Sequence, residues 1–118
     1  MKDAFYQPDK KNVEDKLVRY FRNVYEFYTY VEKNKVLGTI IIRKEKDKTI
    51  IEAIGVTDKS RNKGIGRTLI NIVKQENRFL YAETDAEAIG FYRSIGFAVK
   101  EITRIYNNEK VKRYECIL

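Results

Sequence analysis

The sequence predicts a mixed α+β domain, and two observations support this. Apolar residues recur at helical spacing over residues 13–24, 64–73 and 85–95. Between and after these segments, runs rich in β-branched and aromatic residues alternate with a period of two or end at turn residues. The predicted order is α-β-β-β-α-β-α-β-β, a mostly antiparallel sheet flanked by helices. A length of 118 residues suits a single domain.

The first half of the chain predicts a helix followed by a three-stranded meander. The helix is expected over residues 13–24, where five apolar positions follow the helical period: Val13, Leu17, Tyr20, Phe21 and Val24. Strands are expected over residues 25–31, 36–44 and 49–56, with polar turns between them.

The second half predicts a helix, a strand, another helix and a hairpin. A helix starts at Gly64 after a polar loop, and a strand covers residues 78–84. The helix over residues 85–95 ends at Gly96, which suits a left-handed cap. The last two strands, residues 97–106 and 110–118, turn at an Asn-Asn pair.

Composition limits the kinds of chemistry that the chain can perform. It lacks histidine, which excludes Ser-His-Asp and Cys-His triads and argues against a zinc site. The one cysteine, Cys116, is expected to be a packing residue. No apolar run is long enough to cross a membrane and the start lacks a signal core, so a cytoplasmic location is expected. The net charge of +7 suits an anionic partner, either nucleic acid or a phosphate-bearing cofactor.

The segment from residue 56 to residue 69 has the pattern of a phosphate-binding loop. A strand ends, a basic loop follows, and a helix opens at Gly64 and Gly66. Glycines let a ligand approach the backbone, and a helix N-terminus offers free N–H groups to an anion. The Walker pattern is absent, and Leu69 replaces the third glycine of a dinucleotide fingerprint. The alternative is a glycine turn beneath an ordinary helix.

Two segments resemble the GNAT superfamily of acetyl-CoA-dependent N-acetyltransferases. The loop Arg61-Asn62-Lys63-Gly64-Ile65-Gly66 is similar to the Arg/Gln-x-x-Gly-x-Gly/Ala motif of that family. Residues 88–97, Ala-Ile-Gly-Phe-Tyr-Arg-Ser-Ile-Gly-Phe, are similar to its later Ala-x-x-Phe-Tyr-x-x-x-Gly-Phe segment. The resemblance covers roughly residues 49–100.

The resemblance implies acetyl-CoA as the cosubstrate. Its pantetheine arm would lie between the third strand and the strand from residue 78, and its pyrophosphate would bind the basic loop. The implied cofactor-binding residues are Ile54, Gly55, Val56, Arg61, Asn62, Lys63, Gly64, Ile65, Gly66, Arg67, Thr68, Asp85 and Ala88. Asp85 departs from the family, which commonly has asparagine there, so its role as a cofactor contact is weakened.

The resemblance also implies catalytic roles, and no metal is expected because the chain lacks histidine. Tyr92 would be the general acid that protonates the leaving thiolate; its alternative role is packing beside Phe91. The backbone N–H of Val56 would polarise the thioester carbonyl. Glu52 stands in an apolar run and is a candidate general base, directly or through water; alternatively it is a solvent-facing strand residue.

The implied activity is transfer of an acetyl group to a primary amine by direct attack in a ternary complex. We expect a small-molecule or peptide amine as acceptor, a homodimer as a family-level expectation, and neither nucleic acid nor membrane as partner. The N-terminal region is short for the family, so the acceptor pocket would be open or completed by a second subunit. Two alternatives stay open: a non-catalytic acyl-CoA-binding module, and a basic nucleic-acid-binding domain.

Overall fold

The computed structural model describes residues 17–22, 25–77 and 79–118. This part of the chain forms seven strands, two α-helices and one short 3-10 helix. The elements are β1 (Leu17–Arg22), β2 (Tyr25–Glu32), β3 (Lys35–Lys44), β4 (Thr49–Val56), the 3-10 helix (Asp58–Ser60), α1 (Ile65–Glu76), β5 (Leu80–Thr84), α2 (Ile89–Ile95), β6 (Ala98–Tyr106) and β7 (Glu109–Ile117).

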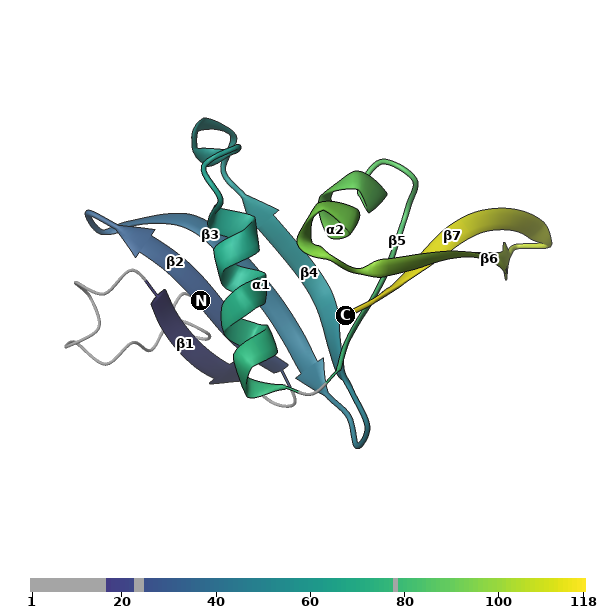
Figure 1. Cartoon of the computed structure of the whole chain (residues 1–118), viewed down its shortest axis with the longest axis horizontal. Coiled ribbons are helices and arrows are strands. Elements are labelled where there is room, and N and C mark those ends of the chain that lie inside the picture. The colour runs from purple at the N-terminus through teal and green to yellow at the C-terminus, as the bar shows by residue number, and fades with distance from the viewer. Residues whose placement is uncertain (1–16, 23–24, 78) are drawn as a thin grey trace.

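The strands form one sheet in the order β1-β2-β3-β4-β5-β7-β6. All neighbours are antiparallel except β4 and β5, which are parallel. Helix α1 packs on β2, β3 and β4, whereas α2 contacts β6 and β7 (Figure 1). The β6–β7 hairpin projects from the body of the domain (Figure 1). This is the predicted mixed fold, with a sheet that is antiparallel apart from its central pair.

The hydrophobic core lies between the sheet and the two helices. Its fully buried side chains are Tyr28, Ile40, Ile42, Leu69, Ile70, Val73, Leu80 and Cys116. Burial of Cys116 confirms its predicted packing role, and burial raises the pKa of its thiol. Among the described residues, no helix is long and apolar enough to cross a membrane.

The predicted first helix is wrong for the residues that the structure describes. Leu17–Arg22 is strand β1, which pairs antiparallel with β2 from Leu17 opposite Tyr30 to Arg22 opposite Tyr25. The other positions of the predicted helix, residues 13–16 and 23–24, lie outside the described residues. Val, Tyr and Phe in this segment favour strands, and pairing with β2 supplies backbone hydrogen bonds that outweigh a short helical period.

The other elements agree with the prediction, except at the start of α2. The helix expected from residue 85 begins at Ile89. The carboxylate of Asp85 accepts hydrogen bonds from the N–H groups of Glu87 and Ala88, which makes a turn in place of the first helical turn. Gly96 has φ 116° and ends α2 as predicted. Asn107 and Asn108 have positive φ in the last hairpin.

Gly38 allows α1 to approach β3 closely, so a side chain there is expected to destabilise the fold. A Cβ on Gly38 would lie 2.9 Å from Cγ2 of Ile65 and 3.2 Å from the carbonyl oxygen of Gly55. We expect Gly38→Ala to lower the free energy of unfolding by about 1–3 kcal/mol, measured by urea denaturation. The control is Gly55→Ala on β4, because a Cβ there meets no atom within 4 Å. Equal stability of the two variants would contradict this packing.

Candidate active site

Strands β4 and β5 separate soon after they meet, and a pocket fills the gap. Their only paired residues are Thr49 with Leu80 and Ile50 with Tyr81. Beyond these pairs lies a pocket of about 780 Å³. Its walls are β4, the loop and first turn of α1, the end of β5, and one side of α2. A long, thin ligand could therefore lie between the two strands.

The backbone of β4 faces this gap at alternate residues. On β3, Thr39 lies opposite Gly55 and Ile41 lies opposite Ala53. Just beyond the paired strands, the N–H of Thr57 donates to the carbonyl of Leu37 at 2.9 Å. In an antiparallel ladder, hydrogen-bonded and non-hydrogen-bonded pairs alternate. The backbone N–H and C=O groups of Gly55 thus hydrogen-bond to β3, whereas those of Ile54 and Val56 point towards β5. Because β5 does not pair with β4 at this level, Ile54 and Val56 can hydrogen-bond a ligand.

The loop before α1 has the geometry of an anion site. Asn62 and Gly64 adopt positive φ of 65° and 80°, and helix α1 follows at once. No side chain caps the helix start, so the N–H groups of its first turn are open to a ligand. A Cβ on Gly66 would lie 3.0 Å from two ring atoms of Phe91. A side chain at position 66 would therefore crowd Phe91 beside the start of α1.

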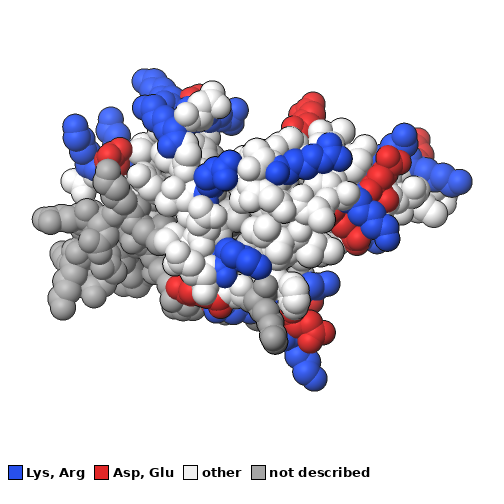
Figure 2. Space-filling model, viewed as in Figure 1, with Lys and Arg blue, Asp and Glu red and all other residues white. Residues whose placement is uncertain are grey.

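Positive charge surrounds this end of the pocket. Arg61 and Arg67 line it, and Lys and Arg side chains gather on the loop before α1 (Figure 2). Nε of Arg61 donates to the carbonyl of Val56 at 3.3 Å, and Nη2 of Arg67 donates to the carbonyl of Ser94 at 2.9 Å. The second bond ties α1 to α2 across the pocket.

Tyr92 lines the pocket from α2. It is 5% exposed and its ring makes edge contacts with Phe91 and Phe97, at centroid distances of 5.2 and 5.0 Å. Within the described residues, its hydroxyl group has no hydrogen-bond partner. Burial raises the pKa of the phenol to about 12, and Cys116 adds to the rise. Tyr92 therefore keeps its proton throughout the physiological range.

Glu52 lines the pocket from β4 and is the extra residue of a β-bulge. Ile41 lies opposite Ala53 and Ile42 opposite Ile51, which leaves Glu52 unmatched. Its carboxylate accepts a hydrogen bond of 2.8 Å from Nε of Arg43. Because Ile42 is buried towards α1, Arg43 and the Glu52 carboxylate lie on the face away from that helix.

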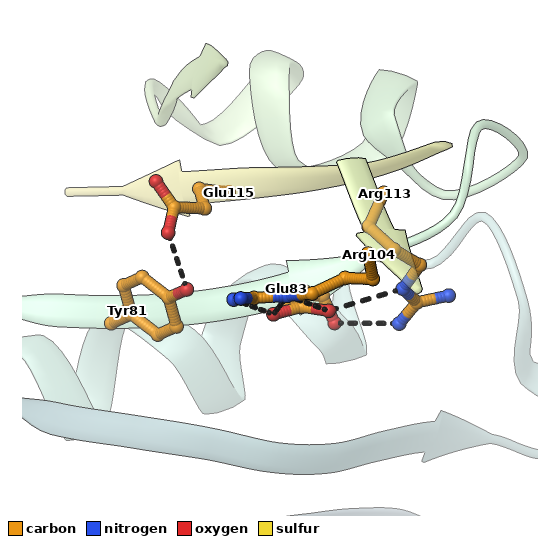
Figure 3. A network of polar contacts seen from close by, with 5 residues as sticks. All are labelled: Tyr81, Glu83, Arg104, Arg113 and Glu115. Atoms are coloured by element: carbon orange, nitrogen blue, oxygen red, sulfur yellow. Dashed lines mark hydrogen bonds and ion pairs between the residues drawn. The ribbon is translucent and has the colours of Figure 1, made fainter. Parts of the chain in front are cut away.

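Glu83 lines the pocket from β5 and belongs to a polar network (Figure 3). Arg104 on β6 and Arg113 on β7 both contact its carboxylate, and Tyr81 donates to Glu115 at 2.9 Å. The hydrogen-bonded guanidinium of Arg104 holds the pKa of Glu83 below its usual range; burial opposes this and Arg113 adds to it. The Glu83 carboxylate is therefore ionised at neutral pH.

Most of the predicted site residues come together in this pocket. Its lining includes Glu52, Ile54, Gly55, Val56, Arg61, Asn62, Gly64, Ile65, Gly66, Arg67, Ala88 and Tyr92. Three predicted residues are not part of the lining: Lys63, Thr68 and Asp85. The hydroxyl of Thr68 donates to the carbonyl of Gly64 at 2.9 Å, and Asp85 caps its own turn. Within the described residues, no group of three His, Cys, Asp or Glu side chains could hold a metal ion.

Sequence reasoning missed part of the lining, chiefly on α2 and β5. The additional residues are Ile51, Ala53, Ser60, Glu83, Thr84, Phe91, Ser94 and Ile95. Phe91 and Ile95 lie three and seven residues after Ala88, so the helical period could have placed them on its face. The sequence marks Glu83 only as an acidic residue at the end of a strand. Its place in the pocket depends on where β4 and β5 separate.

Comparison with known proteins assigns the chain to a family of transferases. A sequence model described as "Acetyltransferase (GNAT) domain" matches residues 23–99. The match covers well over half of the chain, which therefore belongs to the GNAT acetyltransferase family. This confirms the resemblance noted in the loop before α1 and in residues 88–97. No curated protein sequence matches significantly.

Solved structures show the same fold. A Bacillus anthracis protein assigned as a streptothricin acetyltransferase, in complex with acetyl coenzyme A, has a TM-score of 0.69 at 23% identity, covering 82% of this chain and 63% of that one. Arabidopsis thaliana NAA60 in complex with acetyl-CoA has a TM-score of 0.67 at 16% identity, covering 81% of this chain and 76% of that one. The Escherichia coli ribosomal-protein-S18-alanine N-acetyltransferase has a TM-score of 0.63 at 17% identity, covering 98% of this chain and 81% of that one. The chain thus spans less than two thirds of the Bacillus protein.

Proposed function

We propose that the protein transfers an acetyl group from acetyl-CoA to a primary amine. The observation that carries the proposal is the separation of β4 from β5 beside an uncapped, basic helix N-terminus. Two solved structures of the same fold hold acetyl-CoA in their complexes. In the proposed complex the pyrophosphate binds the first turn of α1, and pantetheine pairs with the backbone of Ile54 and Val56.

The reaction is a direct attack of the amine on the thioester. The acceptor ammonium first loses one proton, and its nitrogen then forms a bond to the carbonyl carbon. The N–H of Ile54 or Val56 stabilises the developing oxyanion. Collapse breaks the C–S bond, the nitrogen releases its second proton to water, and the thiolate gains one from Tyr92. One proton is released overall, and Tyr92 recovers its own from water.

Glu52 is the proposed acceptor of the first proton. An amine with a pKa of about 10.4 is about 0.04% neutral at pH 7, which adds about 4.6 kcal/mol to the barrier. A carboxylate, or a water molecule held by it, gives that proton an acceptor within the site. Glu52 lines the pocket beside the separation of the strands, and its bond to Arg43 fixes its carboxylate there.

The proposed function is tested by thiol release from acetyl-CoA with a panel of primary amines, followed by mass spectrometry of the products. We expect release that depends on the amine, together with an acetylated amine. If the folded protein binds acetyl-CoA but releases no thiol with any amine, it is an acyl-CoA-binding module and the proposal fails.

Glu52→Gln is expected to lower kcat/KM about a hundredfold at pH 7, because the base is lost. The loss should shrink as pH approaches the pKa of the acceptor, since more of the amine then arrives neutral. The control is Glu45→Gln, which removes the other carboxylate on Arg43 but lies outside this pocket. A pH-independent loss, or one shared by the control, would assign Glu52 a merely structural role.

A further inference from the structure

We infer that the acceptor is an amine carrying a second positive charge, and that Glu83 is the residue that selects it. This inference rests on the proposed function and names the substrate class of that site. It starts from the distribution of charge along the pocket. The ionisable side chains that line it are Arg61, Arg67, Glu52, Glu83 and Tyr92.

The two arginines and the two glutamates occupy different parts of the pocket. Arg61 and Arg67 belong to the loop and first turn of α1, where the pyrophosphate is proposed to bind. Glu52 and Glu83 each stand two residues beyond the last parallel pair, Ile50 with Tyr81, one on each wall. The charged side chains that line the pocket are therefore arginines where it would hold the cofactor, and glutamates where the strands begin to separate. Each glutamate is paired with arginine outside the lining.

Both carboxylates lie on the face of the sheet away from the helices. Ala82 and Cys116 are paired and fully buried beneath α2, so their neighbours Glu83 and Glu115 face the other way. Glu52 lies with Arg43 on the face away from α1, as shown above. An acceptor that enters from this face meets one carboxylate on each strand.

The Glu83 carboxylate is held in place and still has room for a further donor. Nη2 of Arg104 donates to Oε1 at 2.8 Å, but the contacts to Oε2 are long: 3.4 Å from Nε of Arg104 and 3.3 Å from Nε of Arg113. A carboxylate has about four lone-pair sites, so Oε2 can accept a stronger bond from an ammonium group. Neither arginine lines the pocket, so the ligand meets the carboxylate and not the guanidinium groups behind it.

These positions separate the roles of the two carboxylates. Glu52 serves the amine that reacts, and Glu83 on the opposite wall binds a second ammonium group of the same acceptor. A neutral group in that place loses this ion pair, and a carboxylate there meets a like charge. The acceptor class is therefore a diamine or polyamine, and amines with a carboxylate at the far end are disfavoured.

The test compares acceptors of equal chain length: putrescine, butylamine and γ-aminobutyrate, which end in an ammonium, a methyl and a carboxylate group. We expect kcat/KM to fall in that order, with putrescine preferred over butylamine by about fivefold or more, the effect of a partly exposed ion pair. The preference should weaken as salt is raised. Equal values for putrescine and butylamine, or a preference for γ-aminobutyrate, would overturn the inference.

Glu83→Gln should lower the ratio of kcat/KM for putrescine to kcat/KM for butylamine to about one, and Glu83→Asp should retain part of the preference. The matched control is Glu115→Gln, because Glu115 is the cross-strand partner of Glu83 but does not line the pocket. It should keep the full preference; loss of the preference in this control would show that net charge alone is responsible. Circular dichroism checks that each variant is folded.

A titration of the same three amines into the CoA-bound protein distinguishes failure of the proposed acetyl transfer from failure of the selection by Glu83. If no amine releases thiol, tighter binding of putrescine than of butylamine in wild type but not in Glu83→Gln still supports the selection by Glu83. Equal binding overturns it. If thiol is released at the same rate whatever the charge at the far end of the amine, this inference is wrong and the acetyltransferase function still stands.

Discussion

Replacement of Tyr92 with phenylalanine is expected to lower kcat about a hundredfold, with the affinity for acetyl-CoA unchanged within about twofold. The phenol is the proposed donor to the leaving sulfur. Its ring packs between Phe91 and Phe97, and a phenylalanine ring keeps both contacts. Steady-state kinetics and a binding titration measure the two effects separately.

The pH profile provides a second check on Tyr92. Because the phenol has a pKa of about 12, the neutral form that donates persists below pH 11, and Tyr92 should cause no alkaline loss of activity in that range. The control is Tyr81→Phe, since the pKa of Tyr81 is also raised to about 12 but its hydroxyl binds Glu115 outside the pocket. Unchanged kcat in Tyr92→Phe, or an equal loss in the control, would remove Tyr92 from the mechanism.

Gly66→Val is expected to raise the Kd for acetyl-CoA by about a hundredfold or more. Its Cβ would lie 3.0 Å from the ring of Phe91, and its branched side chain would occupy the open first turn of α1. Losing two hydrogen bonds to charged phosphate costs about 3–6 kcal/mol in total, at about 1.5–3 kcal/mol each. Isothermal titration of the variant with acetyl-CoA measures the change.

The matched control for this change is Gly90→Val on α2. Gly90 immediately precedes Phe91, but a Cβ there meets no atom within 4 Å, and the residue does not line the pocket. We expect its Kd to stay within about twofold of wild type. If Gly66→Val is folded and binds acetyl-CoA normally, the pyrophosphate does not bind at the start of α1.

The sequence predicted the conformation of the loop before α1 well because its signals are local. Gly64, Gly66 and the basic residues around them determine backbone conformation and charge without help from distant parts of the chain. The same holds for Gly96 and for the Asn107-Asn108 turn, where positive φ favours those residue types. Each of these expectations agrees with the structure.

The sequence-based predictions failed where the structure depends on contacts between distant parts of the chain. Residues 17–22 carry a weak helical period, but their pairing with β2 made them a strand. The role of Glu83 depends on the strand separation after Tyr81 and on two arginines that come from β6 and β7. No local pattern in the sequence predicts that these residues come together, so only the structure could place Glu83 in the pocket.

The most direct test of the account is an NMR titration of the isotope-labelled protein with acetyl-CoA. We expect saturable shifts of the backbone amide signals of Ile54, Val56, Gly64 and Gly66, while signals from the tip of the β6–β7 hairpin stay in place. No shift in the folded protein, or shifts confined to that hairpin, would contradict a cofactor site between β4 and β5.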